Sequence, residues 1–135
     1  MRVALDTNVV SEVIKPHCDP NVLSWIRGLA TADLALPAPC LAELHVGLHL
    51  LPNGARRQRL ERAVEAFIDE IPMILPFDRS AAEAFADIAT APGRPRPTMD
   101  ALIASICVGQ GLPLATRNVR DFAGCGMGLI NPWEP

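Results

Sequence analysis

Val3-Ala4-Leu5-Asp6-Thr7-Asn8 is the stretch of this 135-residue chain that decides its fold. Its apolar start predicts a short buried strand over residues 2–6, which a helix follows through Ile14. Either Asp6 or Thr7 can cap that helix, because both side chains accept hydrogen bonds from the free N–H groups of a first turn. A carboxylate beside a buried strand also needs a partner, since burying an unpaired charge is costly.

The alternation of short apolar runs with helical patterns continues along the chain. Helices are predicted over residues 20–26, 39–50, 55–70, 79–90 and 98–109, and strands over 34–36, 73–75, 112–115 and 129–130. Strands that alternate with helices indicate a parallel sheet covered on both faces. Functional sites in such sheets gather beyond the carboxyl ends of the strands, where Asp6 and the predicted loop 116–121 both fall. We expect one α/β domain over residues 1–135.

The composition fits a domain with a real core and excludes some classes of protein. Half of the residues are hydrophobic and 20% are charged, so the chain is not a disordered tail. Only 4% are aromatic and Tyr is absent, which argues against a stacking platform for single-stranded nucleic acid. The net charge of −3 argues against a simple nucleic-acid binder, although two bound divalent cations would reverse its sign.

The basic residues are unevenly distributed. Four arginines crowd residues 56–62, and four more lie near acidic residues in sequence: Arg94, Arg96, Arg117 and Arg120. Guanidinium groups suit phosphate recognition, but a solvated helix face explains the first group equally well.

The cysteines and the apolar runs indicate where in the cell the protein is located. The four cysteines form no C-x-x-C pair, and Cys40 and Cys107 are predicted to be small core residues. We therefore expect reduced thiols and a cytoplasmic protein. The first apolar run is not a signal peptide because Asp6 interrupts it, and glycines and Pro113 exclude a membrane span over residues 101–116.

Four acidic residues far apart in sequence lie where a βα fold would direct them toward one place. Asp6 and Asp121 each follow a predicted strand, whereas Glu43 and Asp100 lie on apolar helices. Carboxylates that converge repel one another, so a divalent cation is their natural partner. The leading hypothesis is therefore a Mg²⁺ or Mn²⁺ site and, with it, phosphoryl chemistry.

Each acidic residue also has an ordinary structural explanation. Asp6 can be a helix cap, Glu43 can face solvent on an amphipathic helix, and Asp121 can belong to a turn. Asp100 can favour the dipole at the start of its helix, with Thr98 as the cap. Each explanation alone is better than metal binding for a single residue, but the four positions together favour a shared site.

Other chemistries are less well supported. His45 and His49 have zinc-like spacing, but no further His or Cys lies close to them in sequence. A phospho-receiver domain needs a late Lys, whereas the single Lys here is Lys15. A haloacid-dehalogenase-type phosphatase needs a second Asp where Asn8 stands.

Four motifs follow one another along the chain: Leu5-Asp6-Thr7-Asn8-Val9-Val10-Ser11-Glu12, Ala42-Glu43-Leu44 followed by Gly47, Asp100-Ala101-Leu102-Ile103-Ala104, and Ala115-Thr116-Arg117-Asn118-Val119-Arg120-Asp121-Phe122. In this order they resemble PIN-domain ribonucleases, and more closely the VapC-type toxins of VapBC pairs, including the FitB-like branch. Leu75-Pro76-Phe77-Asp78 and Asn131-Pro132-Trp133 add to the resemblance, which spans essentially the whole chain.

The resemblance implies a single PIN domain, a three-layer α/β/α sandwich with a short parallel central sheet, and a Mg²⁺- or Mn²⁺-dependent endoribonuclease. Asp6, Glu43 and Asp100 would be acidic-site residues, with Asp6 and Asp100 as direct metal ligands. Relatives carry the fourth acidic residue where either Asn118 or Asp121 stands here. We assign this role to Asp121, with Asn118 as a neutral helper.

The resemblance also implies the toxin of a type II toxin–antitoxin pair, which forms a homodimer and is held inactive by a cognate VapB-type antitoxin. The C-terminal segment of that antitoxin would lie across the acidic groove, and contact with DNA would be indirect, through the antitoxin. The alternative is a non-catalytic PIN-like scaffold that only binds a partner.

For the reaction, we expect hydrolysis of RNA phosphodiester bonds by a metal-activated water, without a covalent enzyme intermediate. Thr7 and Thr116 would orient carboxylates or water, and Asn8 is assigned to the same supporting group. Arg117 would either contact an RNA phosphate or form an ion pair with one of the acids.

Overall fold

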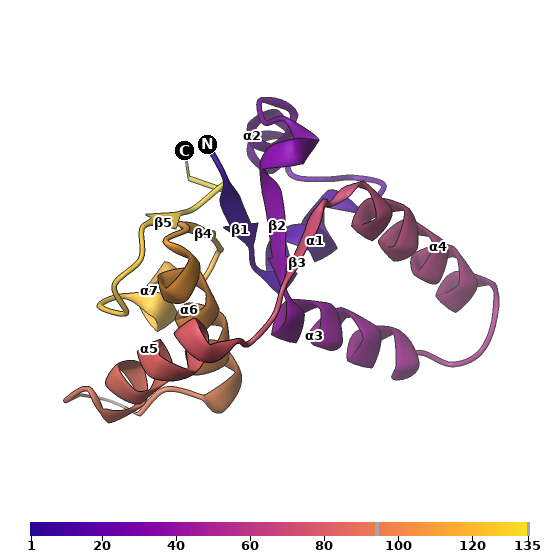
Figure 1. The fold of residues 1–135 in the computed structure, drawn as a ribbon. Coiled ribbons are helices and arrows are strands. Elements are labelled where there is room, and N and C mark those ends of the chain that lie inside the picture. The colour runs from indigo at the N-terminus through magenta and orange to yellow at the C-terminus, as the bar shows by residue number, and fades with distance from the viewer. Residues whose placement is uncertain (94, 135) are drawn as a thin grey trace.

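Five short parallel strands cross the middle of the computed structural model, which describes residues 1–93 and 95–134 (Figure 1). Arg94, one of the arginines counted above, lies outside the described residues. The strands are β1 (Val3–Leu5), β2 (Leu34–Pro37), β3 (Met73–Leu75), β4 (Leu114–Ala115) and β5 (Leu129–Ile130). Both β1 and β4 are completely buried, which explains why their sequences are continuously apolar rather than alternating.

Helices cover both faces of this sheet and make the molecule a three-layer α/β/α sandwich. They are α1 (Thr7–Val13), α2 (Pro20–Arg27), α3 (Ala38–His49), α4 (Ala55–Glu70), α5 (Arg79–Thr90), α6 (Thr98–Gln110) and α7 (Val119–Phe122), with a 3₁₀ turn at Thr31–Asp33. In the view of Figure 1, α3 and α4 extend to one side of the strands, and α5 and α6 to the other. In the described part of the chain, no helix has the length and apolar character needed to cross a bilayer.

The strand order fixes where a ligand site can form. The sheet has the order β3-β2-β1-β4-β5, so the chain builds outward from β1 on one side and then returns to build the other side. The crevice between the carboxyl ends of β1 and β4 is therefore a topological switch point, where parallel α/β sheets bind ligands. Asp6 directly follows β1 and Thr116 directly follows β4, so both lie at this point.

Helices α5 and α6 approach each other closely at Gly109. A Cβ atom added at Gly109 of α6 would lie 3.0 Å from the backbone nitrogen of Ala81 and 3.1 Å from the carbonyl carbon of Ser80. Asp78 caps α5 by accepting a 3.0 Å hydrogen bond from the same Ala81 nitrogen. The start of α5 is therefore fixed against α6 by backbone contacts.

Several details differ from the predicted elements, and one of them is the fourth strand, which begins at Leu114 rather than residue 112. The first strand ends at Leu5 rather than residue 6, because Asp6 leaves the strand to become the N-cap of α1. Thr98 does not cap α6, because Pro97 occupies the N-cap position and no side chain caps the helix. The last three residues of the predicted loop 116–121 form, together with Phe122, the one-turn helix α7.

Candidate active site

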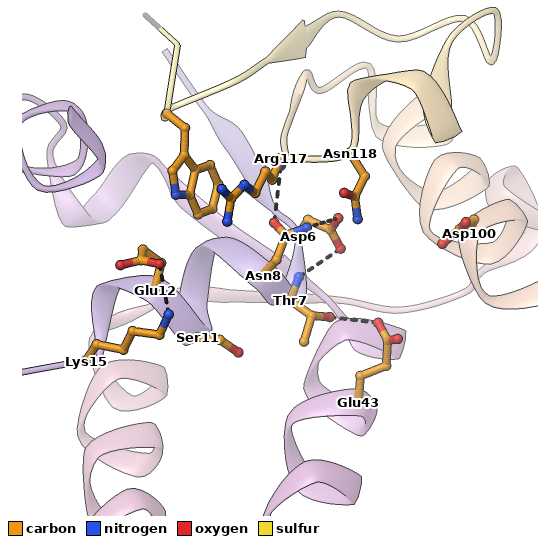
Figure 2. Close-up of a pocket in the computed structure, with 11 residues that line it drawn as sticks. Asp6, Thr7, Asn8, Ser11, Glu12, Lys15, Glu43, Asp100, Arg117 and Asn118 are labelled. Atoms are coloured by element: carbon orange, nitrogen blue, oxygen red, sulfur yellow. Dashed lines mark hydrogen bonds and ion pairs between the residues drawn. The ribbon is translucent and has the colours of Figure 1, made fainter. Parts of the chain in front are cut away.

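An open cavity of about 420 Å³ lies over the switch point, and Asp6, Glu43 and Asp100 all line it (Figure 2). Asp6 reaches the cavity from the end of β1, Glu43 from the middle of α3, and Asp100 from the first turn of α6. Three acidic side chains from three separate parts of the sequence thus share one space. Side chains of like charge in one cavity are unfavourable unless a cation or hydrogen-bond donors compensate them.

Asp6 is the most buried of these carboxylates, with 6% of its surface exposed. Its Oδ1 accepts the backbone N–H of Thr7 at 2.8 Å, and its Oδ2 accepts the Thr116 hydroxyl at 2.7 Å and the side-chain amide of Asn8 at 3.4 Å. Burial raises the pKa of Asp6 above its ordinary value, while the bonds from Thr116 and Thr7 oppose that rise. The helix cap and the site carboxylate are therefore the same group.

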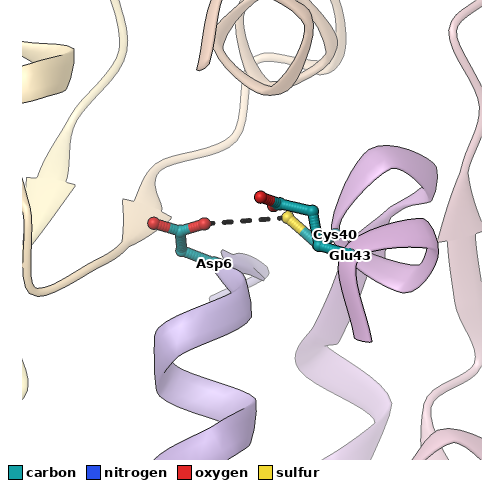
Figure 3. A group of neighbouring side chains, drawn as sticks. All are labelled: Asp6, Cys40 and Glu43. Atoms are coloured by element: carbon teal, nitrogen blue, oxygen red, sulfur yellow. Dashed lines mark hydrogen bonds between the residues drawn. The ribbon is translucent and has the colours of Figure 1, made fainter. Parts of the chain in front are cut away.

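A second carboxylate and a thiol lie next to Asp6. The hydroxyl of Thr7 donates to Oε1 of Glu43 at 2.7 Å, and the Cys40 thiol lies 3.8 Å from Oδ1 of Asp6. Asp6, Cys40 and Glu43 each offer one ligand atom, and these atoms all lie within 4.8 Å of one another (Figure 3). Two carboxylates from different elements at this separation form a donor set that fits a hard divalent cation such as Mg²⁺ or Mn²⁺.

The two residues considered for the fourth acidic position, Asn118 and Asp121, lie differently with respect to the cavity. Asn118 lines the cavity, and its backbone N–H donates to the Thr116 hydroxyl at 3.0 Å. Asp121 is half-buried in α7 and is not among the residues that line the cavity, but its charge is close enough to raise the pKa of Asp6. Asn118 is thus part of the cavity surface, whereas Asp121 influences Asp6 without lining the cavity.

Arg117 lies at the edge of the cavity opposite Glu43 and Asp100 (Figure 2). Its backbone N–H donates to Oδ1 of Asn8 at 3.3 Å, and its guanidinium carbon lies 5.1 Å from the centre of the Trp133 ring. Among the ion pairs of residues 1–93 and 95–134, none involves Arg117, so one of the two predicted roles, pairing with an acid of this group, is not observed.

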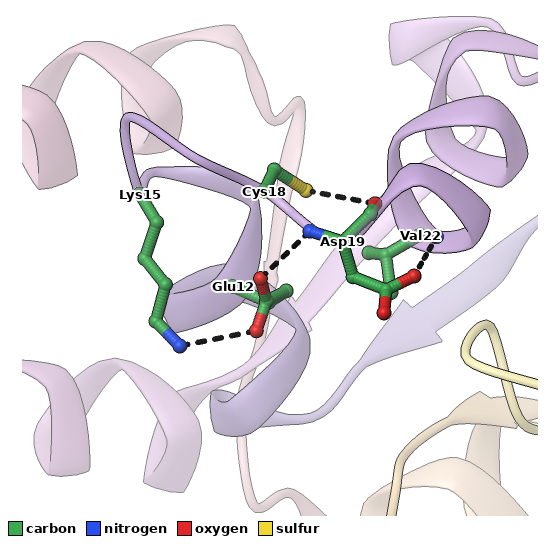
Figure 4. Close-up of polar contacts among 5 residues, drawn as sticks. All are labelled: Glu12, Lys15, Cys18, Asp19 and Val22. Atoms are coloured by element: carbon green, nitrogen blue, oxygen red, sulfur yellow. Dashed lines mark hydrogen bonds and ion pairs between the residues drawn. The ribbon is translucent and has the colours of Figure 1, made fainter.

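Sequence reasoning missed Glu12 and Lys15, which also line the cavity. Glu12 is buried, accepts the backbone N–H of Asp19 at 2.9 Å and pairs with Lys15 at 3.1 Å (Figure 4). The bond from Asp19 and then that from Lys15 lower the pKa of Glu12. Asp19 in turn caps α2 through the N–H of Asn21 at 2.8 Å, so Glu12 connects α1 to the start of α2.

The sequence contained a pattern that could have identified some of these cavity residues. Asn8 and Glu12 are four residues apart, which places them on one face of α1, and Lys15 follows three residues later, just beyond the end of that helix. Cys40, three residues before Glu43, could have been found in the same way. Trp133 had no such signal, because only the folded chain brings residue 133 to the cavity.

Comparison with known proteins places the chain in a family. The PIN domain model matches residues 3–124. The VapC ribonuclease Y4jK of Sinorhizobium fredii is 37% identical and toxin FitB of Neisseria gonorrhoeae is 34% identical, each over 98% of this chain and 99% of the relative.

Solved structures of similar chains have the same fold. A chain of FitAcB from Neisseria gonorrhoeae superposes with a TM-score of 0.85 at 33% identity, covering 98% of this chain and 99% of that one. A chain of FitAB bound to an IR36 DNA fragment superposes with a TM-score of 0.85 at 29% identity, covering 98% and 96%. The resemblance seen in the four motifs is thereby confirmed. The chain belongs to the PIN-domain family, among relatives that include a VapC ribonuclease and toxin FitB.

Proposed function

We propose that this PIN-domain chain is a metal-dependent endoribonuclease and the toxin of a type II toxin–antitoxin pair. The observation that carries the proposal is the convergence of Asp6, Glu43 and Asp100 on one cavity at the switch point of the sheet. The names of the relatives support it, since one is a ribonuclease and another a toxin.

The proposed cofactor is Mg²⁺ or Mn²⁺, held by Asp6, Glu43 and Asp100, with Asp121 adding negative charge close to Asp6. Such a cation, when bound, makes a water nucleophilic at neutral pH and stabilises the negative charge that develops on a phosphate. Carboxylate oxygens are the ligands that these hard cations prefer. The burial of Asp6 adds to the argument, because a buried carboxylate gains most from a cation.

The side chains around the carboxylates have a positioning role in this proposal. Thr116 holds Oδ2 of Asp6, and Thr7 holds Oε1 of Glu43, so each carboxylate presents its remaining lone pairs in a fixed direction. Asn8 bonds Asp6 with its amide nitrogen and the backbone of Arg117 with its amide oxygen. The loop after β4 is therefore held against the carboxylate that it serves.

The proposed partner is a VapB-type antitoxin, through which any contact with DNA is made. The support is that similar chains were solved as FitAB and FitAcB complexes, one of them on DNA. A groove of about 600 Å³ also adjoins the acidic cavity and shares Ser11 and Lys15 with it. Its lining is mainly apolar and includes Ile14, Leu44, Leu48, Leu60 and Val64, so it suits an apolar segment of a partner.

Two further parts of the proposal concern the state of the protein. Homodimer formation stays a prediction, which light scattering of the purified chain would measure. A cytoplasmic location is supported by the four cysteines, which are all free in the structure.

Metal titration and RNA cleavage together test the function. Isothermal titration with Mn²⁺ should give metal-dependent heat for the wild type and for Asp69→Asn, an exposed control on α4, but weak or no heat for Asp6→Asn. The wild type should cut a purified RNA mixture with Mg²⁺ or Mn²⁺ and not with EDTA. If the wild type neither binds metal nor cuts RNA, the chain is a partner-binding scaffold and the enzyme proposal is wrong.

A further inference from the structure

Trp133 is part of the cavity wall, although it lies beyond residues 3–124, which match the PIN domain model. Its backbone is held from two directions: its N–H donates to Oδ1 of Asn131 at 3.0 Å, and its carbonyl accepts the side-chain amide of Asn21 at 3.0 Å. Pro132 before it is buried, and the half-buried indole packs against the core. The ring is therefore a fixed surface rather than a mobile side chain of the C-terminal segment.

Arg117 is held at both ends of its side chain. At the base, its backbone N–H is bonded to Asn8, and the preceding Thr116 is bonded to Asp6. At the tip, the guanidinium carbon lies 5.1 Å from the centre of the Trp133 ring, within the range of about 6 Å in which a cation is attracted to an aromatic face. The stack thus fixes a positive charge beside the carboxylates.

This charge is available to a ligand. Two basic residues line the cavity, and Lys15 is engaged by Glu12 at 3.1 Å. In the described part of the chain, no carboxylate lies within salt-bridge distance of Arg117, whose side chain is exposed. A guanidinium held by a cation–π contact rather than by a carboxylate keeps N–H donors that can bind two phosphate oxygens at once.

We propose that Trp133 is a positioning residue that holds Arg117 in place to bind a backbone phosphate of the RNA. This inference rests on the proposed ribonuclease function. A cavity with several carboxylates repels a phosphodiester, so a fixed cation at its edge has a clear purpose. Stacking on the indole reduces the side-chain freedom that Arg117 would otherwise lose on binding, which strengthens the contact.

A double-mutant cycle tests the coupling. Binding of a short fluorescent single-stranded RNA is measured by anisotropy in EDTA, so that it is not cut, for the wild type, Arg117→Gln, Trp133→Leu and the double variant. We expect Arg117→Gln to lose roughly tenfold in affinity, as for a charge-assisted hydrogen bond. Trp133→Leu should lose roughly three- to tenfold, as for a cation–π contact. The double variant should bind no more weakly than Arg117→Gln, because Trp133 acts only through Arg117.

Two further readouts separate positioning from a general structural role. Trp133→Phe, which keeps an aromatic face, should recover most of the lost affinity. Arg117→Gln should reduce the slope of log affinity against log salt by about 0.7, the value for one phosphate contact to a single strand. The chain has two tryptophans, so Trp25→Phe leaves Trp133 as the only fluorophore. Its emission should change on RNA binding, and this change should disappear when Arg117→Gln is added.

The outcomes are distinct. Two results would overturn the role of Trp133: additive losses of affinity in the double variant, or a Trp133→Leu variant with the wild-type affinity and the wild-type KM for RNA. Metal-dependent cleavage by the wild type would still support the proposed function in either case. A wild type that neither binds nor cuts RNA would remove both. Urea unfolding of every variant identifies any loss that comes from the fold, and the Trp25→Phe experiment needs no change at Trp133.

Discussion

The hydroxyl of Thr116 donates a 2.7 Å hydrogen bond to Oδ2 of Asp6 across 110 residues of sequence. Both residues are buried, and the same hydroxyl accepts the N–H of Asn118 at 3.0 Å. One side chain with a single donor and two acceptor positions therefore connects the end of β1, the end of β4 and the loop that carries Arg117. The contact is structural and lies against the proposed metal ligand.

Thr116→Val should weaken both the fold and metal binding. Valine has nearly the same shape, but it leaves the N–H of Asn118 without its partner and removes a donor from Asp6. We expect the free energy of unfolding in urea to fall by about 1–3 kcal/mol, and the Mn²⁺ affinity measured by calorimetry to fall as well. Thr116→Ser keeps the hydroxyl and is the matched control. A valine variant that matches the wild type in both measurements would show that the contact has no role.

Asp100→Ala should abolish RNA cleavage and leave the fold intact. Removing one of several mutually repelling carboxylates does not create a cavity in the core, because Asp100 is only half-buried. Loss of a metal ligand removes several kcal/mol of transition-state stabilisation, so the cleavage rate should drop by at least about a hundredfold. The measurement is cleavage of a purified RNA beside a thermal melt, with the exposed Asp87→Ala as control. Full activity of Asp100→Ala would contradict its assignment.

Glu12 should make stability depend on acid pH. The hydrogen bonds from Asp19 and Lys15 lower its pKa in the folded state below 4.5, the ordinary value for an unfolded chain. Its contribution is therefore fully present above pH 4.5 and is lost as the pH falls through the lower folded-state pKa.

Glu12→Gln should accordingly reduce the free energy of unfolding by about 1.5–3 kcal/mol at neutral pH, the contribution of hydrogen bonds to a charged group. The difference from the wild type should shrink as urea unfolding is repeated at pH values below 4.5. Glu65→Gln, an exposed change on α4, is expected to have little effect at either pH. A constant difference at all pH values would mean that shape, and not charge, explains the effect of Glu12→Gln.

Gly109→Ala and Gly47→Ala should change stability in opposite directions, although both glycines lie in helices. A methyl group at Gly109 meets backbone atoms of Ser80 and Ala81 at 3.1 and 3.0 Å, which cannot rotate away. We expect a loss of about 1–3 kcal/mol in the free energy of unfolding, as for overpacking. Nothing lies within 4 Å of a methyl group at Gly47, so alanine should add roughly 0.5–1 kcal/mol there. Equal effects in urea unfolding would contradict the close contact between α5 and α6.

Most of the fold could be predicted because its signals are local. The strand Val3–Leu5 followed by a capping residue, and the three- and four-residue spacing of apolar side chains in the longer helices, are set by neighbouring residues alone. The one-turn helix α7 was missed because four residues, Val119–Phe122, are too few to show a helical period. The same short helix decides that Asn118 and not Asp121 reaches the cavity surface, which the sequence could not distinguish.

The candidate site was also predicted only in part. The place of Asp6 follows from the rule that strand ends of a parallel sheet meet at one edge. Glu43 and Asp100 lie on helices, so their approach to Asp6 was expected from their shared acidic character and not from that rule, and the catalytic roles of all three stay predictions. Cys40 and Trp133 were not predicted to approach the carboxylates. The first depends on the rotation of α3 about its axis, and the second on the path of the chain after β5, and neither is encoded by a short pattern.

The central position of β1 has a consequence for how a cell makes this protein. Residues 3–6 leave the ribosome early, but their neighbours in β4, residues 114–115, are translated more than a hundred residues later. Until then, the nascent polypeptide carries Asp6 on a strand that lacks one of its two hydrogen-bonded partners. The cavity is therefore assembled only once residues up to Trp133 have emerged, and translation itself delays the appearance of a finished nuclease site.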